Sequence, residues 1–366
     1  MSADVIVIGA GIVGAACAHE LARAGLDVHV LDAGLGGATG AGMGHLVLMD
    51  DNPAELTLSR ESLKLWHDWG PRMNADCGFN PCGTLWLAAD DEEMSTAQEK
   101  QHRLQANGVK CALLNARALA AAEPALRAGL AGALKVNGDG MVYAPNAARW
   151  LLRQSSRAIT FEAATVTAID GSRVRLADGQ WRSAGAVLLA AGIQAGHFCP
   201  DLPIRPKKGH IAITDRYPGT VHHQLVELGY IKSSHHSPGA SVAFNVQPRP
   251  TGQLLIGSSR QFDTTDPVVE PAMLGRMLRR TLDYLPALAD LNIIRSWTGF
   301  RAATPDSLPI IGQHPEREGL WLAVGHEGLG VTTALATARL LAAQMMGATL
   351  PFDAEPYSAR RFLETK

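Results

Sequence analysis

A glycine pattern near the N-terminus, Gly9-x-Gly11-x-x-Gly14, limits the fold of this chain more than any other feature. Between a strand and a helix, the first glycine permits a tight turn and the second lets the backbone approach a pyrophosphate. The third lets the helix pack against the strand, and the N-terminus of that helix faces the anion. The pattern alone has low specificity, so the flanking residues decide what it predicts.

The residues around this pattern match a βαβ unit. Residues 4–8 and 27–31 are short apolar runs that predict buried parallel strands, and residues 12–24 carry apolar side chains at helical spacing. Asp32 follows the second predicted strand, where a carboxylate can accept hydrogen bonds from the hydroxyls of an adenosine ribose. The sequence therefore predicts a dinucleotide-binding unit, and the carboxylate argues against a 2′-phosphate on that ribose.

Composition excludes several other classes of protein. The chain has 366 residues, of which 46% are hydrophobic, and this length exceeds the usual size of a single core. The formal net charge is −2 and no basic run interleaves with aromatic residues, so no nucleic-acid partner is expected. Five cysteines without a C-x-x-C pair fit a reducing compartment, so we expect a cytoplasmic protein. No uncharged apolar stretch reaches about 18 residues, so no membrane-spanning helix is expected.

The order of the predicted elements indicates an α/β fold with a split domain. A Rossmann-like domain with two dinucleotide-binding signatures is expected at residues 1–50, 140–205 and 300–366. A sheet-rich substrate domain at residues 51–139 and 206–299 is expected to be inserted in it, since residues 210–257 are rich in predicted strands. Helices are predicted at residues 53–69, 91–107, 146–157, 271–284 and 328–346, and a glycine-rich loop at residues 34–44.

Further segments distinguish FAD from NAD as the cofactor. A glycine-rich stretch at residues 37–45 follows the predicted ribose acid, and a second strand-to-glycine signature lies at residues 187–192. Residues 298–312 and 324–330 carry the motifs near the C-terminus. In this order the motifs resemble the D-amino-acid oxidase and glycine oxidase family of flavoproteins, over nearly the full length. The stretch at residues 42–51 is similar to D-hydroxyproline dehydrogenases within that family.

The resemblance implies that the chain binds FAD. His45 could be compared with a histidine that links flavin covalently in some relatives, but its neighbours match that motif poorly, so non-covalent FAD is expected. The glycine motif and the resemblance together predict these FAD contacts: Gly9, Ala10, Gly11, Ile12, Val13, Gly14, Asp32, Ala33, Thr39, Gly42, Met43, Gly44, His45, Leu46, Val166, Ala190, Ala191, Gly192, Gly299, Arg301, Gly325, His326, Glu327, Gly328, Leu329, Gly330, Val331 and Thr332.

The resemblance also assigns a substrate site. Arg301 matches the family arginine that binds the substrate carboxylate, which suits the planar fork of a guanidinium; the alternative is an arginine that only holds a loop. His326 either contacts the substrate and flavin or orders its loop. Phe244 and Asn245 are expected in the substrate pocket, where glycine oxidases place a tyrosine, so a phenolic partner for the carboxylate is in doubt.

No metal site is predicted. His222-His223 and His235-His236 are paired histidines, but neither pair has a carboxylate at a recognisable ligand spacing. Solvated loop histidines are the preferred interpretation.

The reaction implied by the resemblance is oxidation of the Cα–N bond of a small amino acid by hydride transfer to flavin N5. A D-amino acid or cyclic secondary amino acid is expected, with D-proline or a D-hydroxyproline first. The electron acceptor, which could be oxygen, a quinone or a partner subunit, has no sequence signature, and homo- and hetero-oligomers both remain open. Two alternatives are the flavin subunit of a hetero-oligomeric dye-linked amine or opine dehydrogenase, and a flavin-binding scaffold without turnover.

Overall fold

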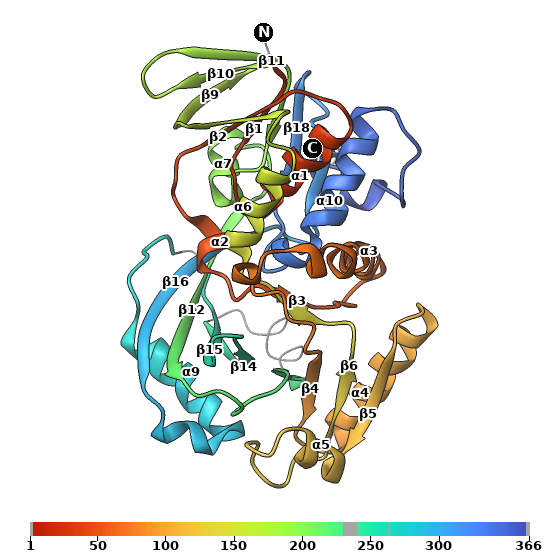
Figure 1. Ribbon diagram of the computed structural model, residues 1–366, viewed down its shortest axis with the longest axis vertical. Helices are drawn as coiled ribbons and strands as arrows, with labels where there is room; N and C mark the ends of the chain where they lie inside the picture. Colours follow the sequence, from red (N-terminus) through yellow and green to blue (C-terminus); the bar gives the residue numbers. More distant parts are fainter. Residues whose placement is uncertain (1–2, 230–239, 263, 364–366) are drawn as a thin grey trace.

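The computed structural model describes residues 3–229, 240–262 and 264–363. Their strands form two eight-stranded sheets and one two-stranded sheet. The two large sheets lie in two lobes, one above the other in Figure 1, and the chain passes between the lobes several times. This arrangement confirms the predicted α/β fold with two sheet-containing parts.

The first sheet has the order β17-β18-β11-β1-β2-β8, with β9 and β10 attached to β11. The strands at its centre pair in parallel and are buried on both faces, so they form continuous apolar runs. The eight strands are β1 (Ala3–Ile8), β2 (Val28–Asp32), β8 (Ile159–Ala163), β9 (Val166–Asp170), β10 (Arg173–Leu176), β11 (Trp181–Leu189), β17 (Ile310–Gln313) and β18 (Leu320–Val324).

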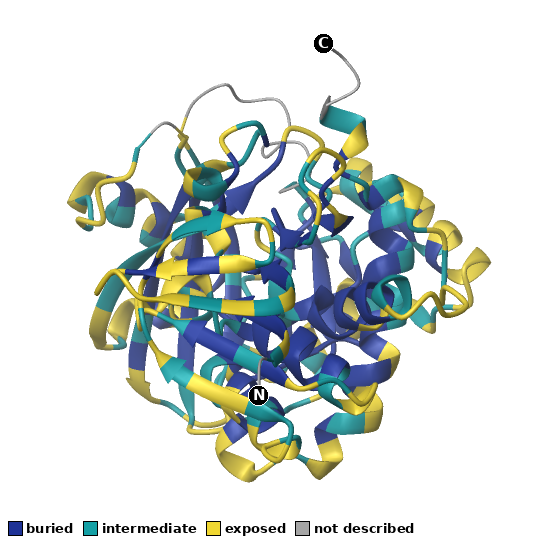
Figure 2. Ribbon diagram, turned by 90° about the horizontal axis from the view of Figure 1, so that it is seen from above, coloured by how far each residue is buried: buried dark blue, intermediate teal, exposed yellow. Residues whose placement is uncertain are grey.

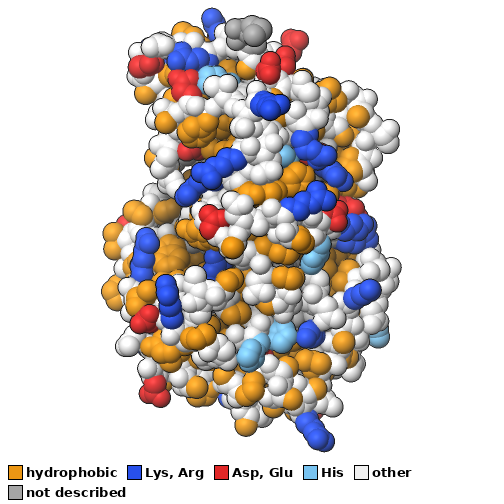
Figure 3. All heavy atoms as spheres, in the orientation of Figure 1, with side chains coloured by type: hydrophobic (Ala, Val, Ile, Leu, Met, Phe, Trp, Pro, Cys, Tyr) orange, Lys and Arg blue, Asp and Glu red, His pale blue; other side chains and the backbone are white. Residues whose placement is uncertain are grey.

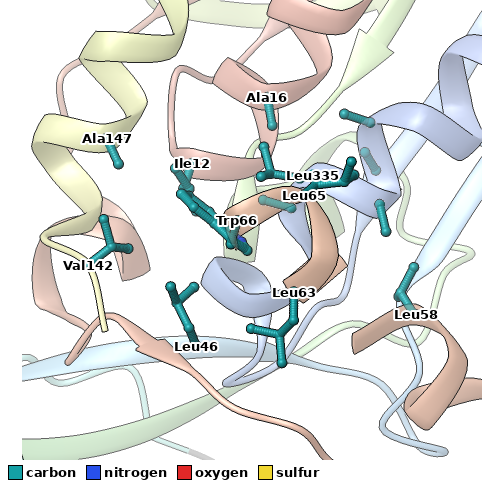
Figure 4. Packing of buried hydrophobic residues seen from close by; sticks show 14 of the residues in the cluster. Ile12, Ala16, Leu46, Leu58, Leu63, Leu65, Trp66, Val142, Ala147 and Leu335 are labelled. Carbon is teal, nitrogen blue, oxygen red and sulfur yellow. The ribbon is translucent and has the colours of Figure 1, made fainter. Parts of the chain in front are cut away.

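Helices α1 (Ile12–Arg23), α3 (Pro53–Trp69), α6 (Ala144–Gln154) and α10 (Gly330–Met345) pack together beside this sheet. Figure 4 shows Trp66 of α3 in the apolar cluster that joins them, near Ile12 of α1. The Trp66 indole Nε1 donates a hydrogen bond to the carbonyl oxygen of Val331 over 3.1 Å, which fixes α3 against the start of α10.

The second sheet has the order β16-β12-β15-β14-β13-β4-β6-β5. Its strands are β4 (Thr84–Ala88), β5 (Cys111–Asn115), β6 (Gly132–Val136), β12 (Arg205–Arg216), β13 (Gln224–Glu227), β14 (Ser241–Pro248), β15 (Gln253–Arg260) and β16 (Ile293–Ala303). Helices α4 (Asp91–Ala106), α5 (Ala116–Ala122) and α9 (Pro271–Tyr284) pack against it. The remaining strands and α-helices are β3 (His45–Leu46), β7 (Gly140–Met141), α2 (Gly37–Ala41), α7 (Ala195–Phe198) and α11 (Arg360–Leu363).

The long predicted helices and the βαβ unit agree with the structure to within a few residues. The prediction of a loop throughout the glycine-rich segment at residues 34–44 is wrong at Gly37–Ala41, which form α2. The domain boundaries stay a prediction. The strands of the first sheet lie inside the segments expected for the Rossmann-like domain, but the boundary at residue 300 falls within β16 of the second sheet.

Burial separates the interior strands from the surface. In Figure 2 the central strands are dark blue, while the outer helices and hairpins are largely yellow or teal. On the face shown in Figure 3, basic side chains cross the middle of the molecule with acidic and hydrophobic ones among them. Among the residues that the structure describes, no helix has both the length and the apolar character needed to cross a membrane.

Candidate active site

One cavity of about 1460 Å³ extends from the glycine motif to the second sheet. The ends of β1, β2 and β11 contribute Gly9, Asp32 and Ala190 to its wall, and the second sheet contributes residues such as Asn245 and Arg301. This volume exceeds the ~300–1,000 Å³ of ordinary ligand pockets, so it has room for a dinucleotide and a small substrate together. The position beyond the carboxyl ends of parallel strands is where doubly wound folds bind such cofactors.

The glycine motif leaves space that larger residues would fill. Gly9 has a φ of +103°, and a Cβ atom there would lie 2.6 Å from the carbonyl oxygen of Ala190. A Cβ atom on Gly14 would lie 1.9 Å from the carbonyl oxygen of Gly9, so α1 can approach β1 only without a side chain at this position. The start of α1 therefore borders the cavity closely, as binding of a pyrophosphate requires.

Asp32 lies at the end of β2 and lines the cavity. Its Oδ2 accepts a hydrogen bond from the backbone N–H of Ala10, and its Oδ1 accepts one from Gly34, each over 2.7 Å. These bonds orient the carboxylate and leave further lone pairs for ribose hydroxyls, because two carboxylate oxygens offer about four acceptor positions. This residue and the space at the glycine turn fit the adenosine half of FAD.

The loop before α10 forms another part of the wall. Residues 325–330 all line the cavity, and the backbone N–H of Glu327 donates to the carbonyl oxygen of Ala302 over 2.9 Å. The ring Nε2 of His326 lies 3.1 Å from Oγ1 of Thr337 on α10, and burial lowers the pKa of His326 to about 3. The imidazole is therefore neutral and bonded to α10, which supports the interpretation that His326 orders the loop.

His45 lies where the glycine-rich segment meets the second sheet. Its Nδ1 donates to the side-chain oxygen of Gln224, and its Nε2 accepts from Nδ2 of Asn245 over 3.0 Å, which assigns the neutral Nδ1–H tautomer. Burial lowers the pKa of His45 to about 4, although its bond to Gln224 acts in the opposite direction. Both ring nitrogens are thus engaged by side chains, which argues against a covalent bond from this ring to a flavin.

We therefore expect acid or heat precipitation of the purified yellow protein to release intact FAD into the supernatant. The absorbance spectrum of the supernatant, with chromatography against authentic FAD, measures this. Flavin that stays with the pellet would contradict non-covalent binding, and a colourless protein that binds NAD would contradict the choice of cofactor.

Arg301 extends from β16 into the cavity wall, where it pairs in register with Lys207 of β12. Its Nη1 donates to the carbonyl oxygen of Ser259 over 3.1 Å. The guanidinium lies so close to the backbone of Gly209 that a Cβ atom there would be 2.6 Å from Nη1. The arginine is therefore held in one place by β12 and β15, while its position in the wall lets it meet a carboxylate.

A charged pair lies beside Arg301. Lys207 of β12 binds Glu327 of the loop before α10, and both side chains line the cavity. Burial lowers the pKa of Lys207 and outweighs the attraction of Glu327, with the charges of Arg260 and Arg301 adding to the decrease. Burial would raise the pKa of Glu327, but Lys207 and Arg260 hold it below the usual range. Cations outnumber carboxylates here, so this part of the cavity favours an anionic group.

Most of the predicted site residues line the cavity. The exceptions are Gly14, Leu46, Thr332 and Phe244. Gly14 packs on the Gly9 carbonyl, Leu46 lies in the core, and Thr332 Oγ1 donates to the carbonyl oxygen of His45 over 3.0 Å. The structure contradicts the placement of Phe244 in the substrate pocket: its ring stacks on Tyr284 at 4.5 Å, on the opposite face of the sheet from Asn245.

Several wall residues carry no signal that sequence patterns could have identified as part of a site. Among them are Asp51 and Glu55 at the start of α3, Trp86 on β4, Lys207 on β12 and Ser258 on β15. Asn52 and Glu55 have the spacing of a capping box, but that spacing predicts a helix start rather than a cavity. The others come from distant strands and carry no local pattern.

Two groups of side chains bear on the question of a metal site. His223 Nδ1 lies 2.7 Å from Glu123, while His235 and His236 lie outside the described residues. Cys199, Asp201 and His314 come close enough to share a metal. However, Arg317 Nη1 lies 3.3 Å from the sulfur, and burial raises the pKa of Cys199 to about 11. A protonated thiol beside a guanidinium is a poor metal ligand, so no metal is assigned to this group.

Curated proteins with similar sequences are flavoenzymes or their subunits. A glycine oxidase of Pseudomonas aeruginosa is 29% identical, and the match covers 98% of this chain and 99% of that protein. One of the subunits of an opine oxidase of Rhizobium meliloti is 27% identical over 98% of this chain and 97% of that protein.

Solved structures with the same fold include enzymes of amino acid and amine oxidation. The L-proline dehydrogenase of P. horikoshii superimposes with a TM-score of 0.88 and 25% identity, over 100% of this chain and 99% of that one. The iminodiacetate oxidase of Chelativorans sp. gives a TM-score of 0.83 and 26% identity, over 97% and 98% of the two chains. The family model of FAD dependent oxidoreductases (DAO) matches residues 4–344. The chain therefore belongs to the DAO family of FAD-dependent oxidoreductases.

Proposed function

We propose that this FAD-dependent amine oxidoreductase oxidises the Cα–N bond of a small D-amino acid or cyclic secondary amino acid. The observation that carries the proposal is Arg301, a guanidinium held in the cavity wall next to the loop at residues 325–330. A fixed planar fork in that position suits a bidentate carboxylate, which every amino acid offers.

FAD supplies the hydride acceptor at its N5 atom when it is bound. The residues of the chain supply position and electrostatics. Arg301 would bind the carboxylate, and Lys207 with Arg260 would add positive potential on the same side. The loop before α10 places backbone N–H groups at the start of a 16-residue helix, where they favour negative charge on a nearby group.

The substrate class is proposed from two kinds of support. The stretch at residues 42–51 is similar to D-hydroxyproline dehydrogenases, and it borders the cavity at Gly42, Met43, Gly44 and His45. Two solved neighbours are named for proline and for iminodiacetate, which are both secondary amines. We therefore place D-proline and D-hydroxyproline first among the substrates.

We expect D-proline or a D-hydroxyproline to bleach the flavin absorbance of the purified protein under nitrogen. A panel of glycine, primary D-amino acids, L-proline and D-proline analogues, read by stopped-flow at the flavin band, measures this. Rapid bleaching by glycine or a primary D-amino acid, with none by the D-proline analogues, would reject the substrate class. Bleaching by none of the amino acids would reject amino acid oxidation itself.

A second candidate is a flavin subunit that passes electrons to a partner chain, as the opine oxidase relative suggests. Turnover of the single purified chain with an artificial dye, compared with oxygen as acceptor, separates an independent enzyme from one that needs a partner. We also propose a cytoplasmic location, because all five cysteines are free thiols.

A further inference from the structure

Glu55 is a buried acid that faces the cavity without a complete set of partners. It lies in the first turn of α3, is only 6% exposed, and belongs to the cavity wall. Its Oε2 has no hydrogen-bond partner among the described residues. A buried carboxyl oxygen left unpaired is costly, so native proteins normally pair such an atom with a ligand or water.

Helix capping explains only part of this arrangement. Asn52 is the N-cap of α3 and accepts a hydrogen bond from the backbone N–H of Glu55 over 2.8 Å, and the Glu55 side chain bonds the backbone of Asp51. Such an acid ordinarily lies at the surface, where the helix dipole favours its ionised form. Burial in a cavity wall is not needed for a cap, and the cap does not use Oε2.

The charges around Glu55 favour a cation. Burial raises the pKa of Glu55 to about 8, and the charges of Asp51 and Glu327 add to this increase, while Lys100 of α4 opposes it. Lys100 is itself bound to Asp50, so its charge is already compensated. The indole Nε1 of Trp86 is a second wall atom without a partner among the described residues. The cavity therefore has one carboxyl-rich side near α3.

This acidic side belongs to the same cavity as Arg301. Glu327 raises the pKa of Glu55, so the two carboxyl groups lie within electrostatic reach of each other. The backbone of Glu327 in turn bonds that of Ala302, the residue after Arg301. A cavity with a guanidinium and an acidic group on different walls suits a zwitterion.

We propose that Glu55 receives the amine of the substrate: the carboxylate binds Arg301, the ammonium binds Glu55, and the proton passes from nitrogen to the Glu55 carboxylate. This inference rests on the proposed function, since it assumes an amino acid substrate. In the step, one N–H bond breaks, one O–H bond forms on Glu55, and the nitrogen keeps the electron pair. The neutral amine that results is the form from which a hydride can leave Cα.

The variant E55Q tests the role of Glu55 without removing the helix cap, since glutamine also serves in a capping box. For the wild type, kcat/KM should rise with pH as Glu55 ionises near pH 8. In E55Q this limb should move to the pKa of the substrate amine, and kcat/KM at pH 8 should fall by about 10²-fold, the usual size of acid–base assistance. The loss should shrink above the pKa of the amine. An unchanged pH profile in E55Q would overturn the proposal.

A binding measurement tests the same group without turnover. The probe is 2-furoate, a planar carboxylate with no amine, whose Kd is read from the change in flavin absorbance. Wild-type binding should weaken as pH rises through about 8, because ionised Glu55 then faces a ligand that offers no cation. In E55Q the Kd should not vary over this range. The same pH dependence in both proteins would overturn the proposal.

Two further outcomes separate Glu55 from the proposed function. If E55Q does not fold, D51N takes its place: loss of the Asp51 charge should move the rising limb of the wild-type profile to lower pH, and an unmoved limb would count against Glu55. If no amino acid reduces the wild-type flavin, the proposed function fails, and the amine as the ligand of Glu55 fails with it. Normal wild-type reduction with an unaltered E55Q profile overturns only the role of Glu55.

Discussion

Replacing Arg301 with methionine should leave folding and FAD binding nearly intact while turnover collapses. Removing one partner of a buried, hydrogen-bonded charge pair costs about 2–5 kcal/mol, partly because the other charge is left unpaired. Because each ~1.4 kcal/mol is a factor of ten, kcat/KM should fall by about 30-fold to several thousand-fold. Arg301→Lys should recover only part of the loss, since an ammonium keeps the charge without the two-pronged geometry. Flavin reduction by the best substrate, with flavin content measured on the same preparation, gives the value.

The opposing interpretation gives a different result. Arg301 Nη1 also donates to the carbonyl oxygen of Ser259, so a purely structural arginine would lower the melting temperature and flavin content on removal. Activity per bound flavin within about threefold of wild type, or ~0.7 kcal/mol, would show that Arg301 does not bind the carboxylate. Arg260 would then be the next candidate, because it lines the cavity. Arg249, another candidate from sequence, instead donates to the carbonyl oxygen of Met43.

Local patterns predicted the parts of the fold that depend on local residues. The apolar run of β1 and the glycine motif after it lie next to each other in sequence, and burial on both faces of the sheet makes such a run readable. Helix α2 was missed because its residues are glycine and alanine with one threonine, which carry no helical pattern. It is fixed by distant contacts, such as the hydrogen bond from Trp297 Nε1 to the carbonyl oxygen of Ala41.

The candidate site divides in the same way. Asp32 and the glycines follow from one motif, and Arg301 follows from a resemblance in another. Lys207 and Glu327 are 120 residues apart, and only the pairing of β12 with β16 and the bridge from Ala302 to Glu327 bring them together. No local pattern records such a contact.

The error at Phe244 has a simple geometric cause. Successive side chains of a strand point to opposite faces, so the two neighbouring residues Phe244 and Asn245 cannot both face the cavity. Asn245 lines the cavity and bonds His45, whereas Phe244 is buried against Tyr284 of α9. Sequence identified the strand, but the uncertain register left the face undetermined.

Gly14→Ala should abolish flavin binding more completely than any change on the substrate side. The new Cβ atom would lie 1.9 Å from the carbonyl oxygen of Gly9 and 3.0 Å from its carbon, and both are backbone atoms that cannot rotate away. Helix α1 must then move off β1, which displaces the turn whose backbone meets the pyrophosphate. Overpacking of this kind costs about 1–3 kcal/mol, occasionally more.

If that strain falls mainly on the FAD-bound state, the Kd for FAD should rise by about 5- to 150-fold, and the purified protein should be nearly colourless. Gly275→Ala in α9 is the matched control, because its Cβ would meet only the flexible end of Arg279 at 3.6 Å, and alanine favours a helix by up to ~1 kcal/mol. The control should keep its flavin and its melting temperature. Flavin content per chain and calorimetric titration of the apoprotein with FAD measure both variants. An FAD affinity of Gly14→Ala within about threefold of wild type would mean that α1 and β1 tolerate the extra methyl group, and that close packing at this glycine is not what forms the cofactor site.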